Sequence, residues 1–226
     1  MMTDDMDKLR AANVVPINGQ PFSLRIIARI FSYIFHPVFV PVYVVYFMVY
    51  WHPNLFTGFS SMLKARTLIM GFVMYCFFPV VTVLLLKALN FITSIKLHSQ
   101  KDRIIPLVAC GVWYFWIWYV WRNLPDYPAE AIRFTLAIWI SVSLALMANI
   151  VMKISLHTIS MGVALAFMLL LAFSQPLNFG LYLSVTFLAT GIVCTSRLLD
   201  SNHTNKEIYS GLALGICSML LAWVAG

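Results

Sequence analysis

The chain has 226 residues, of which 62% are hydrophobic and only 10% are charged, whereas a soluble domain has about 45–50% apolar and about 25% charged residues. This composition excludes an ordinary soluble domain, a disordered chain and a fibrous repeat, and it indicates a multispan membrane protein surrounded by a lipid bilayer. Lys and Arg outnumber Asp and Glu by 15 to 8, which gives a net charge of +7 and favours an anionic lipid or phosphate partner. Because the basic residues are dispersed among apolar runs, we expect no nucleic acid partner.

Residues 1–20 lack the basic region, apolar stretch and cleavage site of a signal peptide, so we expect a polar N-terminal tail. Residues 21–226 are expected to form a single transmembrane domain. A spanning helix needs about 20 apolar residues, and polar or proline-rich breaks divide this part of the chain into runs at about 25–51, 67–90, 104–122, 131–152, 156–173, 179–195 and 208–225. The sequence therefore predicts an all-α, polytopic transmembrane helix bundle of about six to seven spans.

The connectors between these runs are of two kinds. Those after the first, third and fifth runs are typical of ordinary turns. Those after the second, fourth and sixth runs hold nearly all the titratable side chains, with Lys96, His98, Lys101, Asp102 and Arg103 in one, Lys153, Ser155 and His157 in the next, and Arg197, Asp200, His203 and Glu207 in the last. Because successive spans alternate in direction, these three connectors are expected at one membrane face. Ionisable groups at membrane depth are usually functional, so we expect the site there.

The chemistry of this set suits a phosphate ester. Arginine and lysine neutralise phosphoryl oxygens, one imidazole can attack phosphorus, and a second can protonate the departing oxygen. Glu207 follows His203 by four residues, so on a helix the carboxylate lies beside the imidazole and can fix its tautomer. Phosphoryl transfer depends mainly on positioning and charge stabilisation, which explains why several cations are retained.

Three stretches resemble the motifs K-x6-R-P, P-S-G-H and S-R-x5-H-x3-D of the type 2 phosphatidic acid phosphatase superfamily. They read Lys96-x6-Arg103, then Ile154-Ser155-Leu156-His157, then Ser196-Arg197-x5-His203-x3-Glu207. The phrases KISLH at 153–157 and NHT at 202–204, together with His36-Pro37, are similar to a compact bacterial branch of that superfamily.

The resemblance implies a role for each motif residue. His203 would be the nucleophile that forms a phosphohistidine, Glu207 its orienting carboxylate, and His157 the acid for the leaving group. The expected phosphate ligands are Lys96, Arg103, Ser155 and Arg197, and possible further contacts are Lys153, Lys101 and His98. No metal or other cofactor is expected. The implied substrate is a lipid phosphate or polyprenyl diphosphate, such as phosphatidic acid or undecaprenyl diphosphate, in a bacterial inner membrane.

Departures from the motifs leave an alternative open. The proline of the first motif is displaced to Pro106, Ile154 and Leu156 replace the proline and glycine of the second, and Glu207 replaces aspartate. The alternative is a non-catalytic lipid-phosphate binding protein or a transporter. Eight acids are too few for the aspartate clusters of magnesium-dependent membrane transferases. A metal site built from His157, His203, Glu207 and Asp200 is a further hypothesis.

Two expectations remain for other features. His36 and His52 precede prolines and are interpreted as helix-breaking or packing positions. The positive-inside rule puts the site on the cytoplasmic side, whereas the resemblance implies the outer face of the inner membrane. Lysines and arginines retained for phosphate chemistry bias the count that the positive-inside rule uses, so both membrane faces stay open. The sequence does not indicate an oligomeric state.

Overall fold

The computed structural model describes residues 21–95, 97, 99–200 and 203–226, so the expected tail at 1–20 lies outside the described residues. Within this part of the chain every regular element is a helix. Six helices are long and apolar enough to cross a membrane, namely Ser61–Ala88, Gln100–Arg122 (α6), Ala129–Val151 (α7), Leu156–Ser174 (α8), Gly180–Asp200 (α9) and Asn205–Ala225 (α10). The predicted all-α polytopic bundle is confirmed, and the chain is a multi-pass membrane protein.

The first of these six spans contains a local widening. It comprises α4 (Ser61–Phe72), a π-helical turn (Val73–Phe77) and α5 (Phe78–Ala88). Pro79 lies in the first turn of α5, and a proline has no N–H to donate back to the preceding turn. The wider turn accommodates this missing hydrogen bond without ending the helix.

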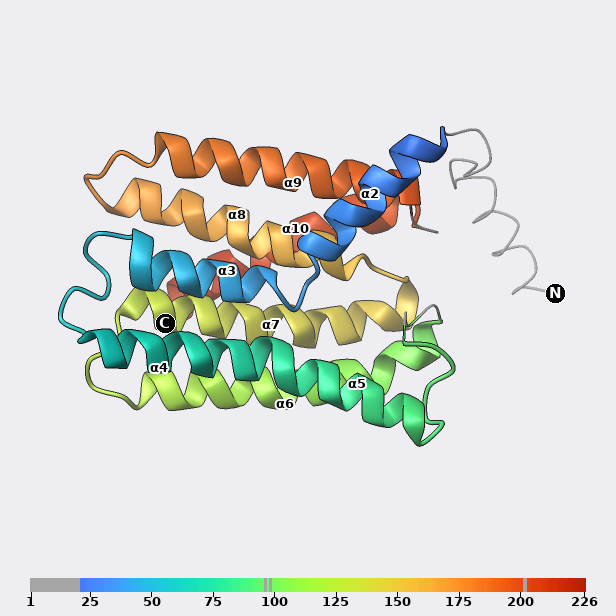
Figure 1. The fold of residues 1–226 in the computed structure, drawn as a ribbon, viewed down its shortest axis with the longest axis horizontal. Coiled ribbons are helices and arrows are strands. Elements are labelled where there is room, and N and C mark those ends of the chain that lie inside the picture. Colours follow the sequence, from blue (N-terminus) through green and yellow to red (C-terminus); the bar gives the residue numbers. More distant parts are fainter. Residues whose placement is uncertain (1–20, 96, 98, 201–202) are drawn as a thin grey trace.

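The predicted span at 25–51 is not a single helix. It consists of α2 (Phe22–Ile34), a break, α3 (Val40–Tyr46) and a terminal π-helical turn (Phe47–Trp51). The break contains Pro37, which cannot donate a helical hydrogen bond and disfavours helical backbone in the preceding residue. α2 packs against α9, whereas α3 packs against α4 and α8, and the two helices meet between the ends of the bundle (Figure 1). His36 lies in this break, in agreement with its interpretation as a helix-breaking or packing position.

Three spans begin earlier in the chain than their apolar runs predict. The hydroxyl groups of Ser60, Ser99 and Thr204 cap α4, α6 and α10 by accepting a backbone N–H from the first turn. Such capping residues satisfy donors that have no partner inside the helix. Counting apolar residues misses these turns because their side chains are polar.

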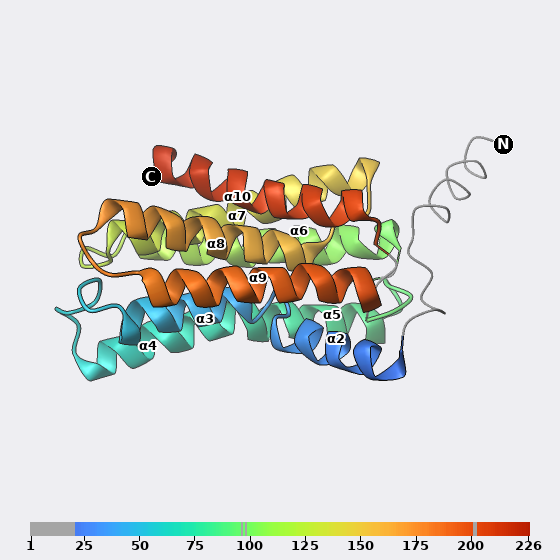
Figure 2. The ribbon, with the colours of Figure 1, turned by 90° about the horizontal axis from the view of Figure 1, so that it is seen from above.

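The helices alternate in direction, so the connectors divide between two ends of the bundle. Those after α5, α7 and α9 lie at the end where α2 begins, and those before α4, α7 and α9 lie at the opposite end (Figure 1). Viewed from above, α10 and α4 lie on opposite sides of the bundle (Figure 2). The prediction that the three titratable connectors share one end is confirmed.

Glycines allow α8 and α10 to pack closely. A Cβ atom added to Gly215 of α10 would overlap the carbonyl oxygen of Ile159, and one added to Gly162 of α8 would overlap that of Leu212. Small residues of this kind let transmembrane helices approach until their backbones touch. This contact positions the start of α8 beside the start of α10, where the second and third motifs lie.

We expect Gly215→Ala to lower the free energy of unfolding by about 1–3 kcal/mol, because backbone atoms must move to admit the methyl group. The matched control is Gly191→Ala in α9, where nothing lies within 4 Å of the added Cβ. This control is expected to be neutral or to stabilise the protein by up to about 1 kcal/mol. Denaturant unfolding in detergent micelles measures both values. Equal stability of the two variants would contradict the close α8–α10 contact.

Candidate functional site

His203 and Glu207 form a buried pair at the start of α10. Thr204 caps the helix, its Oγ1 accepting the N–H of Glu207 at 3.2 Å, and Glu207 Oε2 accepts the N–H of Thr204 at 3.1 Å. The same Oε2 lies 3.1 Å from Nδ1 of His203, and the two residues are only 5% and 4% exposed. Because a carboxylate accepts hydrogen bonds, Nδ1 carries the proton and Nε2 has the free electron pair. The capping box therefore holds the carboxylate that orients the imidazole.

The surroundings of His203 favour its neutral form. Burial lowers the pKa of His203 below its usual value, the hydrogen bond with Glu207 opposes this shift, and the charges of Arg197 and Arg103 lower the pKa further. The imidazole is therefore neutral at pH 7, which is the form with a nucleophilic nitrogen.

Hydrogen bonds to backbone groups connect the first and second motifs with the segment that holds His203 and Glu207. Arg103, in the first turns of α6, donates from Nη1 to the carbonyl of Ile154 at 2.7 Å and from Nε to the carbonyl of Leu97 at 3.1 Å. Ser155 donates its N–H to the carbonyl of Glu207 at 3.3 Å. Arg103 thus joins two of the connectors, and Ser155 joins the second of them to α10.

The Ser155 hydroxyl has no partner in the described part of the chain. The residue is fully buried, and Oγ makes no hydrogen bond. Buried polar atoms nearly always have a hydrogen-bond partner, so a buried hydroxyl without one is unusual. The backbone of the same residue is hydrogen-bonded to Glu207. The expected hydrogen bond from Ser155 to an anion stays a prediction.

His157 lies in the first turn of α8 and contacts α2. Its Nε2 is 3.1 Å from the carbonyl oxygen of Ser32, and its ring centroid is 5.2 Å from that of His36 at an interplanar angle of 82°. Nη1 of Arg197 is 3.5 Å from Oγ of Ser32. The charge of Arg197 acts on both His157 and His203, so the histidines of the second and third motifs lie within electrostatic range of the same arginine.

Sequence reasoning missed Ser32 and the partner of His36. His36 was interpreted as a helix-breaking or packing position, and the ring on which it packs is His157. The available signal was a His-Pro pair inside an apolar run long enough to span a membrane. Ser32 gave no signal, since a single serine in an amphipathic helix is ordinary.

Two further predicted contacts are described by the structure, and two lie outside the described residues. Lys101 is exposed in the first turn of α6, and Lys153 is half-buried beside Ile154. Lys96 and His98 lie outside the described residues, so their predicted roles stay predictions.

The structure does not support the hypothetical metal site. Asp200, one of its four expected ligands, lies 3.1 Å from Nη2 of Arg29 in an ion pair. Among the residues that the structure describes, no group of three or more histidine, cysteine, aspartate or glutamate side chains is arranged to hold a metal ion. The charges of Arg197 and Arg103 instead act on His203, which suits an anionic ligand.

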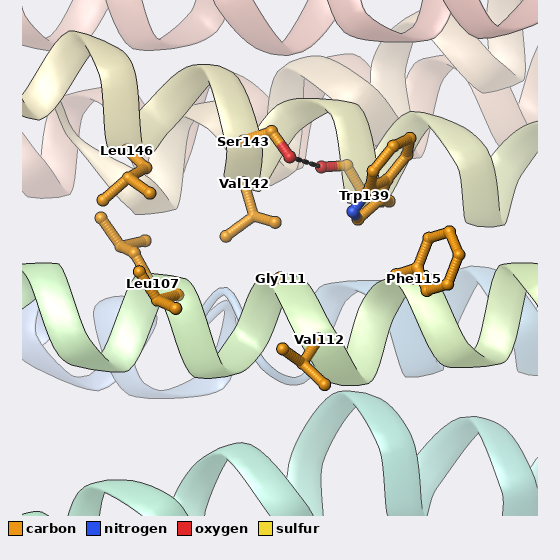
Figure 3. A pocket seen from close by; sticks show the side chains of 9 residues that line it. Leu107, Gly111, Val112, Phe115, Trp139, Val142, Ser143 and Leu146 are labelled. Atoms are coloured by element: carbon orange, nitrogen blue, oxygen red, sulfur yellow. Dashed lines mark hydrogen bonds between the residues drawn. The ribbon is translucent and has the colours of Figure 1, made fainter.

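A separate apolar groove of about 340 Å³ runs between α6 and α7 (Figure 3). It lies beside Gly111, and its one side-chain hydroxyl, on Ser143, donates to the carbonyl of Trp139 in the same helix at 2.9 Å. None of the predicted site residues lines it. The groove therefore offers packing surface rather than reactive groups.

Comparisons with protein-family models, with curated proteins and with solved structures find no match for this chain. The chemistry of the cluster must therefore be inferred from its own groups. These are the imidazoles of His157 and His203, two arginines, the Glu207 carboxylate and the Ser155 hydroxyl.

Proposed function

We propose that this chain is an integral membrane phosphatase of the type 2 phosphatidic acid phosphatase kind. It releases phosphate from a lipid phosphate or polyprenyl diphosphate in a bacterial inner membrane, without a metal or other cofactor. The observation that carries this proposal is the buried His203–Glu207 pair, in which a neutral imidazole is oriented by a carboxylate while Arg103 and Arg197 supply positive charge.

In the first step, Nε2 of His203 attacks phosphorus and the bond from phosphorus to the lipid oxygen breaks. The proton on Nδ1 stays in the hydrogen bond with Glu207, whose negative charge stabilises the positive charge that develops on the ring. The departing oxygen takes a proton from Nδ1 of His157, which is protonated once the anionic substrate is bound beside it, and leaves as the lipid alcohol or, for a diphosphate, as the lipid monophosphate.

In the second step, water attacks the phosphorus of the phosphohistidine. His157, now neutral, takes one proton from the water as its oxygen bonds to phosphorus, and the bond from phosphorus to Nε2 of His203 breaks. Inorganic phosphate leaves, and both histidines return to their starting protonation states. The same imidazole thus acts first as acid and then as base.

The arginines supply charge stabilisation in both steps. Phosphoryl transfer spreads negative charge over three oxygens, and guanidinium groups form strong paired hydrogen bonds with them. Keeping such cations partly buried in a membrane protein is costly, and a phosphoryl ligand is a partner that offsets this cost. The same residues also fit the alternative, a protein that binds lipid phosphates without cleaving them.

A release assay separates these two functions. Purified protein in liposomes is incubated with phosphatidic acid, phosphatidylglycerol phosphate, a sphingoid phosphate or undecaprenyl diphosphate, and inorganic phosphate is measured. Release by the wild-type protein supports the phosphatase. Binding of these lipids with no release from any of them would instead support the binding protein or transporter.

Glu207→Gln tests the orienting carboxylate through the pH profile. Because the pKa of His203 is lowered, the wild-type kcat/KM should decline only below pH 6.5, where the nucleophile becomes protonated. Glutamine keeps an oxygen for Nδ1–H but removes the charge that raises this pKa, so the acid limb should move to lower pH. We expect kcat at pH 7 to fall by about 10²-fold, because the ring loses its stabilising charge. An acid limb that stays in place or moves to higher pH would contradict this role.

A further inference from the structure

The end of α2 has an irregular hydrogen-bond pattern. The N–H of His36 donates to the carbonyl of Tyr33 at 3.3 Å, whereas a regular α-helix would direct it to the carbonyl of Ser32. The regular partner of the Tyr33 carbonyl would be the N–H of residue 37, but residue 37 is proline and has none. Pro37 therefore accounts for the shift, which leaves the carbonyl of Ser32 without a partner inside the helix.

His157 supplies the partner for that carbonyl. Nε2 of His157 lies 3.1 Å from Ser32 O. A carbonyl oxygen only accepts, so Nε2 is the protonated nitrogen and Nδ1 of the neutral ring carries the free electron pair. The same turn of α2 also contacts Arg197 through the Ser32 hydroxyl, so it touches two groups of the candidate site.

His36 limits the position of this ring. The rings of His36 and His157 meet nearly at right angles, with centroids 5.2 Å apart, and Nδ1 of His36 is 3.5 Å from the N–H of Val38 in the break. The loop that follows α2 thus holds the His36 ring beside His157. Packing of this kind restricts the rotamers that a neighbouring ring can adopt.

We infer that the break between α2 and α3 is a positioning device for His157. The break frees the Ser32 carbonyl, which accepts the Nε2–H of His157 and thereby fixes this tautomer. Protons therefore leave and return through Nδ1 of His157. This inference rests on the proposed function, in which His157 protonates the departing oxygen. Ser32, His36 and Pro37 act through His157 and are positioning residues. The N-terminal helix pair, which contains none of the three motifs, thereby becomes part of the site.

Pro37→Ala tests the device directly. Alanine restores an N–H at residue 37, so the carbonyls of Tyr33 and Ser32 can regain helical partners and His157 loses its acceptor. We expect kcat for lipid-phosphate hydrolysis to fall by about 10-fold to 10²-fold with KM changed less than about twofold, because the acid is misplaced while the phosphate ligands remain. The matched control is Pro41→Ala, at the start of α3, where a missing N–H breaks no helical hydrogen bond.

Nitrogen NMR of the five histidines, labelled with ¹⁵N, gives a readout that does not depend on activity. The His157 signals are assigned by their loss in His157→Gln. In the substrate-free protein, we expect His157 to carry its proton on Nε2 alone in the wild type and in Pro41→Ala. In Pro37→Ala, we expect a mixture of the two His157 tautomers.

The two measurements distinguish the inference from the function on which it rests. If the wild-type protein releases no phosphate but the tautomer of His157 still changes in Pro37→Ala, the phosphatase proposal fails and the positioning device is supported. An active wild type in which Pro37→Ala keeps full turnover, or in which His157 carries its proton on Nδ1, would overturn the device.

Discussion

His203→Gln is expected to lower kcat for every lipid phosphate that the wild type hydrolyses by at least about 10⁴-fold, as removal of a covalent nucleophile does in other enzymes. Glutamine is close to imidazole in size and accepts or donates hydrogen bonds, so Glu207 keeps a partner and the fold is retained. It has no nitrogen that can form a phosphoramidate, so the first step cannot occur. Phosphate release from liposomes, measured against protein-free liposomes, gives the value.

The matched control is His52→Gln. His52 is also a buried histidine, but it lies at the opposite end of the bundle, where its Nδ1 accepts the N–H groups of Asn54 and Leu55 at 3.2 Å. Its replacement should leave kcat within a few-fold of the wild type. Retained turnover in His203→Gln would show that His203 is not the nucleophile. Equal losses of kcat in His203→Gln and His52→Gln would indicate a general effect of losing a buried histidine.

Arg197→Gln is expected to lower kcat/KM by about 10²-fold. A hydrogen bond to a charged group contributes about 1.5–3 kcal/mol, and the guanidinium is proposed to contact the phosphoryl group both in the bound substrate and in the transition state. The loss should therefore appear in affinity as well as in rate. Lipid-phosphate binding and hydrolysis are both measured in liposomes.

Arg29→Gln is the control for the loss of one positive charge. Arg29 lies at the same end of the bundle but is exposed and forms its ion pair with Asp200. We expect its kcat/KM to stay within about twofold, because exposed ion pairs contribute little. If both variants lose activity equally, Arg197 acts only through the general positive charge of this end and not as a phosphate ligand.

Much of the fold could be predicted because lipid imposes simple rules on sequence. Long apolar runs correspond to the six spans, and the polar connectors fall at alternate ends. The helix starts at Ser60, Ser99 and Thr204 were missed because capping depends on one hydrogen bond rather than on hydrophobicity. The run at 25–51 was long enough for a span, but Pro37 divides it into two short helices.

The site was predictable to the extent that its residues occur at fixed spacing. The offset of four residues places Glu207 beside His203. The contact of Ser32 with His157 spans 125 positions and depends on how α2 packs against α9. No local pattern encodes a contact of that kind. Lys101 also shows the limit of spacing arguments, because it belongs to the same connector as Arg103 yet faces outward.

The central claim is a phosphoryl group carried covalently on Nε2 of His203. The most direct measurement is to mix the protein with a radiolabelled lipid phosphate, stop the reaction within milliseconds with alkali, which preserves phosphohistidine, and locate the label by mass spectrometry. We expect the label on the peptide containing residue 203, attached at Nε2, in the wild type and none in His203→Gln. Hydrolysis that proceeds with no labelled protein, or a label on His157 instead, would contradict the account.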